Sequence, residues 1–258
     1  MSVAGRMPSQ LEVDSWPGRE RRSPDRSDRH YLTLKPLAEQ LKSELERLLP
    51  GRGGLRVLDI GCGHKPYLPF VADRASSYFG VDAVEGPLVD AVGVAEELPC
   101  ESASVDLILC TQVLEHVDDP ARALAEIHRV LAPGGAVLLS THGVYLYHPD
   151  PPDSDRDYWR WTHAGLVRVV EQAGAWERIG IQAQGNVVAC LGYIVAQFVD
   201  ELGQKLPGRL PGRMLLRMVN SVAEWLDARL PPNARIPAPG SLSSNYLVTA
   251  VKPEAGSG

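Results

Sequence analysis

Hydrophobic and polar positions follow two different periods along this chain. Between residues 32 and 49, apolar positions recur every three or four residues, which predicts an amphipathic helix that ends at the stop signal Pro50-Gly51. Its apolar positions are Leu34, Leu37, Leu41, Leu45 and Leu48. Short runs rich in Val, Leu and Ile follow, with the length and content of buried parallel strands. The pattern therefore predicts an α/β protein.

Strands are expected at residues 55–60, 77–81, 104–110, 136–140, 176–182 and 247–252, because each range is a short apolar run. Further helices are expected from Pro120 to about residue 131 and over residues 164–173. Residues 186–240 hold two more apolar helical segments, 187–202 and 213–230, and we interpret this range as a helical insertion. Residues 1–28 are polar and rich in Pro, Ser, Arg and Asp, so a disordered leader is expected there and one folded domain over 29–258.

Composition narrows the classes of function. A chain of 258 residues with 44% hydrophobic and 22% charged residues can form one well-buried α/β domain. Its net charge of −6 argues against a nucleic-acid partner. The four cysteines are far apart, which favours free thiols in a reducing compartment. Neither a signal-peptide core nor an apolar run of membrane-spanning length is recognised, so we expect a soluble, cytoplasmic protein without a membrane span.

The end of the first predicted strand carries the strongest chemical signal. Asp59 lies near the end of the run 55–60, and Gly61 and Gly63 follow it. In an open α/β sheet, ligands bind just outside the carboxyl ends of the strands. A dinucleotide site would need a third glycine, but Pro66 stands at that position, and the Asp59 carboxylate would repel a pyrophosphate. The turn therefore favours a cationic ligand that carries no phosphate.

The run Val57–Gly63 resembles the first motif of the class I S-adenosylmethionine-dependent methyltransferases, in particular the small-molecule enzymes of the type 11-like group. The runs 113–117 and 129–135 also resemble this family, and the resemblance is near-continuous over residues 55–142. It implies S-adenosylmethionine as the cofactor. It also implies a Rossmann-like, seven-stranded, mostly parallel sheet with helices on both faces, an antiparallel last strand, and a third strand in the segment 93–99. The helical insertion would lie between the sixth and seventh strands.

The residues expected to bind the cofactor follow from this comparison and from the strand ends. Asp82 stands 19 residues after Gly63, a spacing suited to an acid that accepts hydrogen bonds from the ribose hydroxyls. Family members often carry Asp near the adenine where this chain has Val94, so Glu96 or backbone carbonyls are candidates for that contact. The predicted cofactor residues are Asp59, Gly61, Cys62, Gly63, Asp82, Ala83, Ala95, Glu96, Cys110 and Thr111.

The candidate catalytic residues are histidines, because methylation of a hydroxyl oxygen requires a general base. His142 directly follows the fifth predicted strand and is the first candidate, and His148 is the second, with Asp157 as a residue that orients either. His116 suits a structural role as well as a catalytic one, and His163 suits a structural role. The histidines and acids between residues 142 and 157 show no known metal-ligand spacing, so no metal is expected.

The function predicted from the sequence is S-adenosylmethionine-dependent methylation of a small molecule. An oxygen acceptor on a sugar or secondary metabolite is preferred because of the histidines and aromatic residues that follow the fifth strand. A nitrogen acceptor and a non-catalytic, methyltransferase-like binding protein are the alternatives. The apolar insertion 186–240 either walls the substrate pocket or forms a homodimer seam.

Overall fold

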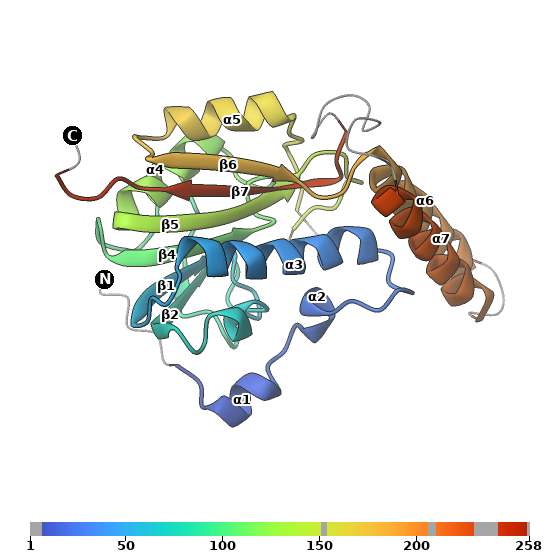
Figure 1. Ribbon diagram of the computed structural model, residues 1–258, viewed down its shortest axis with the longest axis horizontal. Helices are drawn as coiled ribbons and strands as arrows, with labels where there is room; N and C mark the ends of the chain where they lie inside the picture. The colour runs from blue at the N-terminus through green and yellow to red at the C-terminus, as the bar shows by residue number, and fades with distance from the viewer. Residues whose placement is uncertain (1–6, 151–153, 206–209, 230–241, 257–258) are drawn as a thin grey trace.

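A seven-stranded sheet forms the centre of the computed structural model, which describes residues 7–150, 154–205, 210–229 and 242–256. The strand order is β3-β2-β1-β4-β5-β7-β6, and only β7 runs antiparallel to its neighbours. The bounds are β1 Leu55–Ile60, β2 Ala75–Asp82, β3 Ala91–Val92, β4 Val105–Thr111, β5 Leu131–His142, β6 Arg178–Ala183 and β7 Asn245–Val251. The predicted Rossmann-like, mostly parallel architecture is confirmed, and Figure 1 shows the stacked strands.

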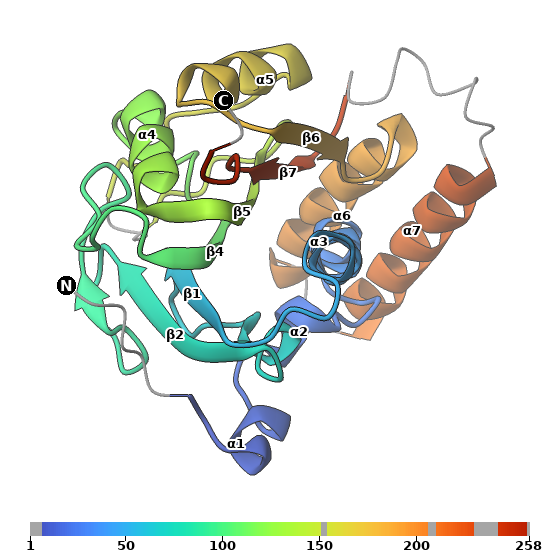
Figure 2. The same ribbon diagram turned by 60° about the vertical axis from the view of Figure 1, so that its left-hand side comes forward.

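Helices cover both faces of the sheet because successive side chains of each strand point to opposite sides. One face packs on α4 (Pro120–Val130) and α5 (His163–Gln172), and the other packs on α3 (Tyr31–Leu48) and the short helix η1 (Leu68–Phe70). Figure 2 shows α4 and α5 on one side of the strands and α3 on the other. In β1, Leu58 and Ile60 pack toward the α4 side while Val57 packs toward α3.

The register of the parallel strands aligns their carboxyl ends. Ile60 in β1 pairs with Val81 in β2 and with Cys110 in β4. The residues that follow, Gly61, Asp82 and Thr111, therefore meet at one edge of the sheet.

The third strand lies earlier than the sequence indicated. β3 comprises only Ala91–Val92, and the segment 93–99 that was expected to be a strand is a loop with a single bridge between Val94 and Glu97. Glycine at position 93 and proline at position 99 flank a segment too short to extend the ladder. This loop instead borders a cavity, as described below.

The leader also differs from the prediction. Residues 7–28 are not a disordered segment but contain two short helices, α1 (Gln10–Asp14) and α2 (Arg19–Arg22), whereas residues 1–6 lie outside the described residues. The Trp16 indole N–H donates to the Lys65 carbonyl at 2.9 Å, and Arg22 donates to the Pro66 carbonyl at 2.6 Å. The prediction of disorder came from the polar composition of the leader. Composition does not reveal these docking contacts, because they join positions more than 40 residues apart.

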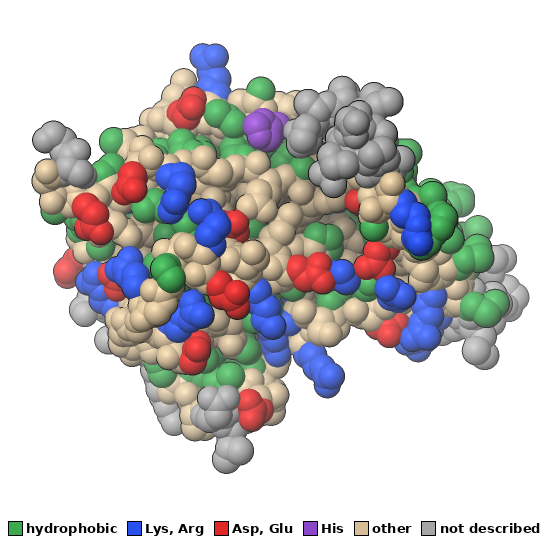
Figure 3. Space-filling view, viewed as in Figure 1, with side chains coloured by type: hydrophobic (Ala, Val, Ile, Leu, Met, Phe, Trp, Pro, Cys, Tyr) green, Lys and Arg blue, Asp and Glu red, His purple; other side chains and the backbone are tan. Residues whose placement is uncertain are grey.

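Two long helices, α6 (Val187–Lys205) and α7 (Leu210–Arg229), form a hairpin between β6 and β7. They pack closely, since a Cβ atom added at Gly192 would lie 2.5 Å from the Ala223 Cβ. By length and composition alone, α6 would qualify as a membrane span. Hydrophobic side chains remain exposed on the hairpin, including Phe198 at 68% and Met214 at 74%, and they gather at the right-hand edge of Figure 3. The expected end of the insertion, residues 230–240, lies outside the described residues.

Candidate active site

Two adjoining cavities open at the carboxyl edge of the sheet. The smaller, of about 350 Å³, is bordered by the loops that follow β2 and β3, and the larger, of about 750 Å³, by the turn after β1 and by residues of the leader. Both are lined by Gly61, Asp82, Gln112, His116 and Asp150, so they form one continuous cleft.

The turn after β1 shapes the floor where the cavities meet. Gly61 has φ +64°, and a Cβ atom there would lie 2.3 Å from the Val113 Cγ2. Glycine is therefore required both for the backbone conformation and for the space. The next glycine, Gly63, donates its backbone N–H to the Asp82 carboxylate at 2.8 Å, and Val84 donates to the other Asp82 oxygen at 3.0 Å. These bonds fix the Asp82 carboxylate at the border of both cavities, and its remaining lone pairs are available.

Beneath the turn, Asp59 is 3% exposed and accepts a hydrogen bond from the Tyr78 hydroxyl at 2.6 Å. Burial raises the pKa of Asp59 to about 7, against the lowering effects of the Tyr78 hydrogen bond and of Lys65. Lys65 is itself held by an ion pair with Asp90. The acid therefore lies within the protein, one layer below the cleft.

Most of the predicted cofactor residues line the cleft, and Asp59 and Cys110 do not. The smaller cavity is lined by Gly61, Asp82, Ala83, Ala95 and Glu96, and the larger one by Gly61, Cys62, Gly63, Asp82 and Thr111. Cys110 is completely buried in the core, and burial raises the pKa of its thiol. Either residue would act on a bound cofactor through the layer above it.

The smaller cavity has an apolar wall that includes Val94, Ala95 and Val113, and several acids at its border, Glu96 among them. Glu96 accepts the backbone N–H of Asp118 at 2.8 Å through its Oε1 atom. This bond ties the loop after β3 to the segment before α4. A flat aromatic base fits such a wall, and Glu96 remains the acidic candidate for an exocyclic amino group.

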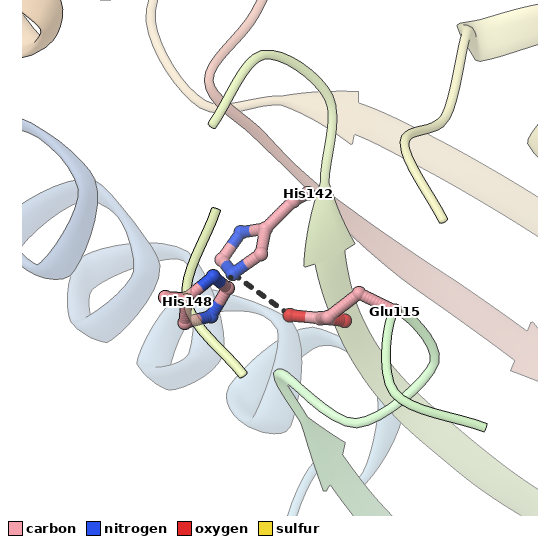
Figure 4. Close-up of side chains that lie close together, drawn as sticks. All are labelled: Glu115, His142 and His148. Carbon is pink, nitrogen blue, oxygen red and sulfur yellow. Dashed lines mark hydrogen bonds and ion pairs between the residues drawn. The ribbon is translucent and has the colours of Figure 1, made fainter. Parts of the chain in front are cut away.

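Beside the larger cavity, Glu115, His142 and His148 converge (Figure 4). The Nε2 atom of His142 lies 2.8 Å from Glu115 Oε1 and 3.2 Å from His148 Nε2. Glu115 and His142 are 0% exposed, while the side chain of His148 is 37% exposed and lines the larger cavity. Only His148 therefore faces the cleft, and the other two residues lie buried behind it.

Hydrogen bonds to the opposite ring nitrogens fix the tautomers. His142 Nδ1 lies 3.2 Å from the Asn245 side-chain oxygen, which is an acceptor because the Asn245 amide N–H donates to Gln184. His148 Nδ1 lies 3.2 Å from the Leu146 carbonyl. Both Nδ1 atoms must therefore donate, which leaves the Nε2 lone pairs of the neutral rings inside the cluster.

The charges of the cluster are strongly coupled. Burial alone would raise the pKa of Glu115, but the neighbouring His142 lowers it to about 2. Burial lowers the pKa of His148, and a positive charge on His142 would lower it further. The Glu115 carboxylate is therefore ionised in the folded protein and favours a positive charge beside it.

Complete burial of His142 excludes direct contact with a molecule in the cleft, so the first catalytic candidate could reach one only through His148. His116 is better placed: it lines both cavities, and its Nδ1 lies 2.7 Å from the Arg156 carbonyl. That carbonyl requires a donor, so the Nε2 lone pair of a neutral His116 is available to take a proton. Asp157 supports the loop by accepting the His148 backbone N–H at 2.9 Å, and His163 packs on the Tyr246 ring outside the cleft.

Sequence reasoning missed several residues that build this site. Glu115 was part of a recognised run, but no local signal showed that it would pair with His142. Asn245 begins β7 and reaches His142 because the two residues pair directly across the antiparallel strands. Gln112 has φ +60°, rare for a non-glycine residue, and donates to Ser140 and to Asn245. Asn245 is placed by strand pairing, and Glu115 and Gln112 are held by side-chain hydrogen bonds to β5 and β7 residues that are distant in the sequence.

A family described as methyltransferase domain matches residues 30–183, which is more than half of the chain. The chain belongs to this family. The predicted class I fold and the assignment to the S-adenosylmethionine-dependent methyltransferases are thereby confirmed, with S-adenosylmethionine as the cofactor.

Curated relatives match over part of their length. The ubiquinone biosynthesis O-methyltransferase of Pseudomonas aeruginosa (strain LESB58) is 37% identical over 109 residues, covering 35% of this chain and 46% of the relative. A probable S-adenosylmethionine-dependent methyltransferase of Mycolicibacterium smegmatis is 35% identical over 141 residues, covering 50% and 55%. The chain thus spans about half the length of these relatives.

Solved structures share the fold. The [4+2]-cyclase SpnF aligns with a TM-score of 0.53 and 21% identity over 84% of this chain and 82% of SpnF. A phosphoethanolamine N-methyltransferase of Haemonchus contortus, solved with S-adenosylhomocysteine, aligns with a TM-score of 0.52 and 18% identity over 87% and 56% of the two chains. At this identity the likeness establishes the fold alone, and one of the two proteins is named for a cyclisation rather than a methylation.

Proposed function

We propose that this protein transfers the methyl group of S-adenosylmethionine to a hydroxyl oxygen of a small-molecule acceptor. The observation that carries the proposal is His116, whose Nε2 lone pair is available where the two cavities meet. The name of the P. aeruginosa relative, an O-methyltransferase, supports an oxygen acceptor. A nitrogen acceptor would need less base catalysis and is the second candidate.

The cleft fits the cofactor. The smaller cavity, with its apolar wall, would hold the adenine, Asp82 would accept hydrogen bonds from the ribose, and the turn at Gly61 and Gly63 would let the amino acid part lie against bare backbone. When bound, S-adenosylmethionine supplies an electrophilic methyl carbon. The larger cavity then holds the acceptor, and His116 takes the hydroxyl proton as the oxygen attacks.

A hydroxylated acceptor suits the larger cavity because polar and charged side chains line it, among them Glu20, Arg21 and His30. A sugar or a hydroxylated secondary metabolite is the proposed substrate class. Stacking of a sugar ring on Tyr145 does not support this choice, since one Tyr145 face covers His142 at 3.6 Å between ring centroids and the other packs on Tyr193 at 4.8 Å.

The test is a methyl-transfer assay with isotope-labelled S-adenosylmethionine and two matched acceptor panels, hydroxylated compounds and their amine analogues. We expect labelled product from the hydroxylated panel and a loss of about 100-fold or more in turnover for His116→Gln, since a general base contributes roughly 100- to 10,000-fold. Label on amines alone would favour N-methylation. Cofactor binding without transfer to any acceptor would favour a non-catalytic protein.

A further inference from the structure

We propose that Glu115 Oε1, His142 Nε2 and His148 Nε2 bind a divalent first-row transition-metal ion at the wall of the acceptor cavity. All three ligand atoms lie within 4.8 Å of one another (Figure 4). Two imidazole nitrogens and one carboxylate oxygen form the ligand set of catalytic zinc sites and of related iron sites, in which further coordination positions stay open.

The orientation of the rings supports a cation at the centre. Acceptors on the outer side, Asn245 for His142 and the Leu146 carbonyl for His148, hold the proton of each ring on Nδ1. The Nε2 lone pairs of both neutral rings then face each other beside a buried carboxylate. Three electron-rich atoms without a donor repel one another, so a positive charge must lie among them.

A single proton would leave part of this cluster unsatisfied. Glu115 Oε1 is buried and accepts no hydrogen bond from the described residues, although His142 Nε2 lies 2.8 Å away. A proton on His142 Nε2 would point toward His148 Nε2, with which the hydrogen-bond geometry is satisfied, and not toward Glu115 Oε1. A buried acceptor without a partner is costly, and a metal ion would satisfy it together with both nitrogens.

The distances fit a metal site. With metal–ligand bonds of about 2.0–2.1 Å, ligand atoms stand roughly 2.9 Å apart in octahedral geometry and roughly 3.3 Å apart in tetrahedral geometry. The observed separations from His142 Nε2 are 2.8 Å and 3.2 Å. Closing the widest separation needs a movement of His148, which lies on a loop with its side chain 37% exposed.

Each ligand is also held from behind, as metal ligands usually are. The second oxygen of Glu115 accepts from the Thr141 hydroxyl at 2.8 Å. The ring of His142 packs on Tyr145, and its Nδ1 donates to Asn245. Asp157 holds the backbone of His148 and is itself bound by Arg160.

A catalytic use of this metal site rests on the proposed methyl transfer. Metal binding itself does not depend on that function. His148 lines the larger cavity, where the acceptor is proposed to bind. An ion bound to His148 Nε2 at about 2 Å would therefore lie close to that acceptor. An acceptor hydroxyl held beside such an ion would lose its proton more readily: its O–H bond would break, the proton would pass to His116 Nε2, and the oxygen would bond to the methyl carbon as the carbon–sulfur bond of the cofactor breaks. The centroids of the His116 and His148 rings lie 5.0 Å apart.

Metal binding is tested on the full chain after chelation and dialysis, by titration with Zn²⁺ and by the visible absorption of Co²⁺. We expect one ion per chain and an affinity at least about 100-fold weaker in His148→Ala and in the isosteric Glu115→Gln. His163→Ala, which removes a histidine outside the cluster, should bind as the wild type does. His148→Ala keeps the test decisive if Glu115→Gln fails to fold, because its side chain is partly exposed.

Equal affinities of the wild type and His148→Ala, with both proteins folded by circular dichroism, would overturn the proposal and leave a proton in the cluster. Calorimetry with S-adenosylmethionine on the metal-free protein separates the two proposals. Metal binding by a protein that does not bind the cofactor would overturn the proposed methyl transfer and leave the metal site standing. Cofactor binding by a protein that takes up no metal in the titration would overturn the metal site and leave the proposed methyl transfer standing.

Discussion

The buried carboxyl of Asp59 predicts an unusual dependence of stability on pH. Burial raises its pKa to about 7, whereas an unfolded chain ionises it near the ordinary value of about 3.9. Between these values the folded state holds a proton that the unfolded state has lost. Stability therefore falls as pH rises through this window and is level again above the folded pKa. Each pH unit corresponds to about 1.4 kcal/mol, so the total loss is about 4 kcal/mol at most.

The variant Asp59→Asn removes this proton. Its side-chain oxygen can still accept the Tyr78 hydroxyl, and it carries no charge to desolvate. We expect wild type and variant to have similar unfolding free energies near pH 4 and the variant to be more stable by up to about 4 kcal/mol near pH 8. Urea unfolding followed by circular dichroism, repeated from pH 4 to pH 8, measures the difference in unfolding free energy between the two proteins. The contributions of most other titrating groups are the same in both and cancel in this difference.

A matched control lies on the neighbouring strand. Asp106 is paired with Arg56 at 3.0 Å, and although burial would raise its pKa, this hydrogen-bonded pair lowers it. Asp106→Asn should therefore lose stability at neutral pH, and the difference from wild type should shrink as the pH falls through the native pKa. Parallel pH profiles of Asp59→Asn and the wild type would refute the reasoning, because Asp59 would then ionise normally.

Three further changes have defined outcomes. Gly61→Ala should lower the free energy of unfolding by roughly 2–4 kcal/mol, because of the left-handed backbone at this position and the contact with Val113. It should also weaken S-adenosylmethionine binding. An unchanged melting temperature would contradict the tight turn. Trp16→Phe removes the N–H that donates to the Lys65 carbonyl and should cost about 1 kcal/mol, while proteolysis should cut the leader faster; equal cleavage rates would show that the leader is not docked. His116→Gln should lower kcat while changing the affinity for the cofactor less than about 3-fold, since loss of a proton acceptor acts on the chemical step; an equal loss in both would point to a binding role.

The sequence predicted the sheet well because most of its signals are local. The buried strands of the sheet centre show up as apolar runs, and the turn at Gly61 shows up as glycines at a fixed spacing. The third strand was placed wrongly because two residues of pairing, Ala91–Val92, leave no periodic pattern. The leader was called disordered because its docking depends on single contacts, such as that of Trp16, rather than on an apolar face.

The acceptor end could be predicted only in part. His148 was placed correctly at the cleft, but the burial of His142 depends on its pairing with Asn245, 103 residues later in the chain. The convergence of Glu115 with two histidines is likewise a product of topology. No metal was expected because the sequence shows no known spacing of metal ligands. Ligands that come together only through the fold, as in the proposed site, leave no such spacing in the sequence.

Calorimetric titration of the purified protein with S-adenosylmethionine, with Asp82→Ala and NAD as controls, tests directly whether the cleft at the end of β1 and β2 binds this cofactor. We expect saturable binding of S-adenosylmethionine at one site, weakened by about 1–3 kcal/mol when the Asp82 carboxylate is removed, and no binding of NAD. Well-folded protein that binds no S-adenosylmethionine, or binds it equally well without Asp82, would contradict the cleft described here.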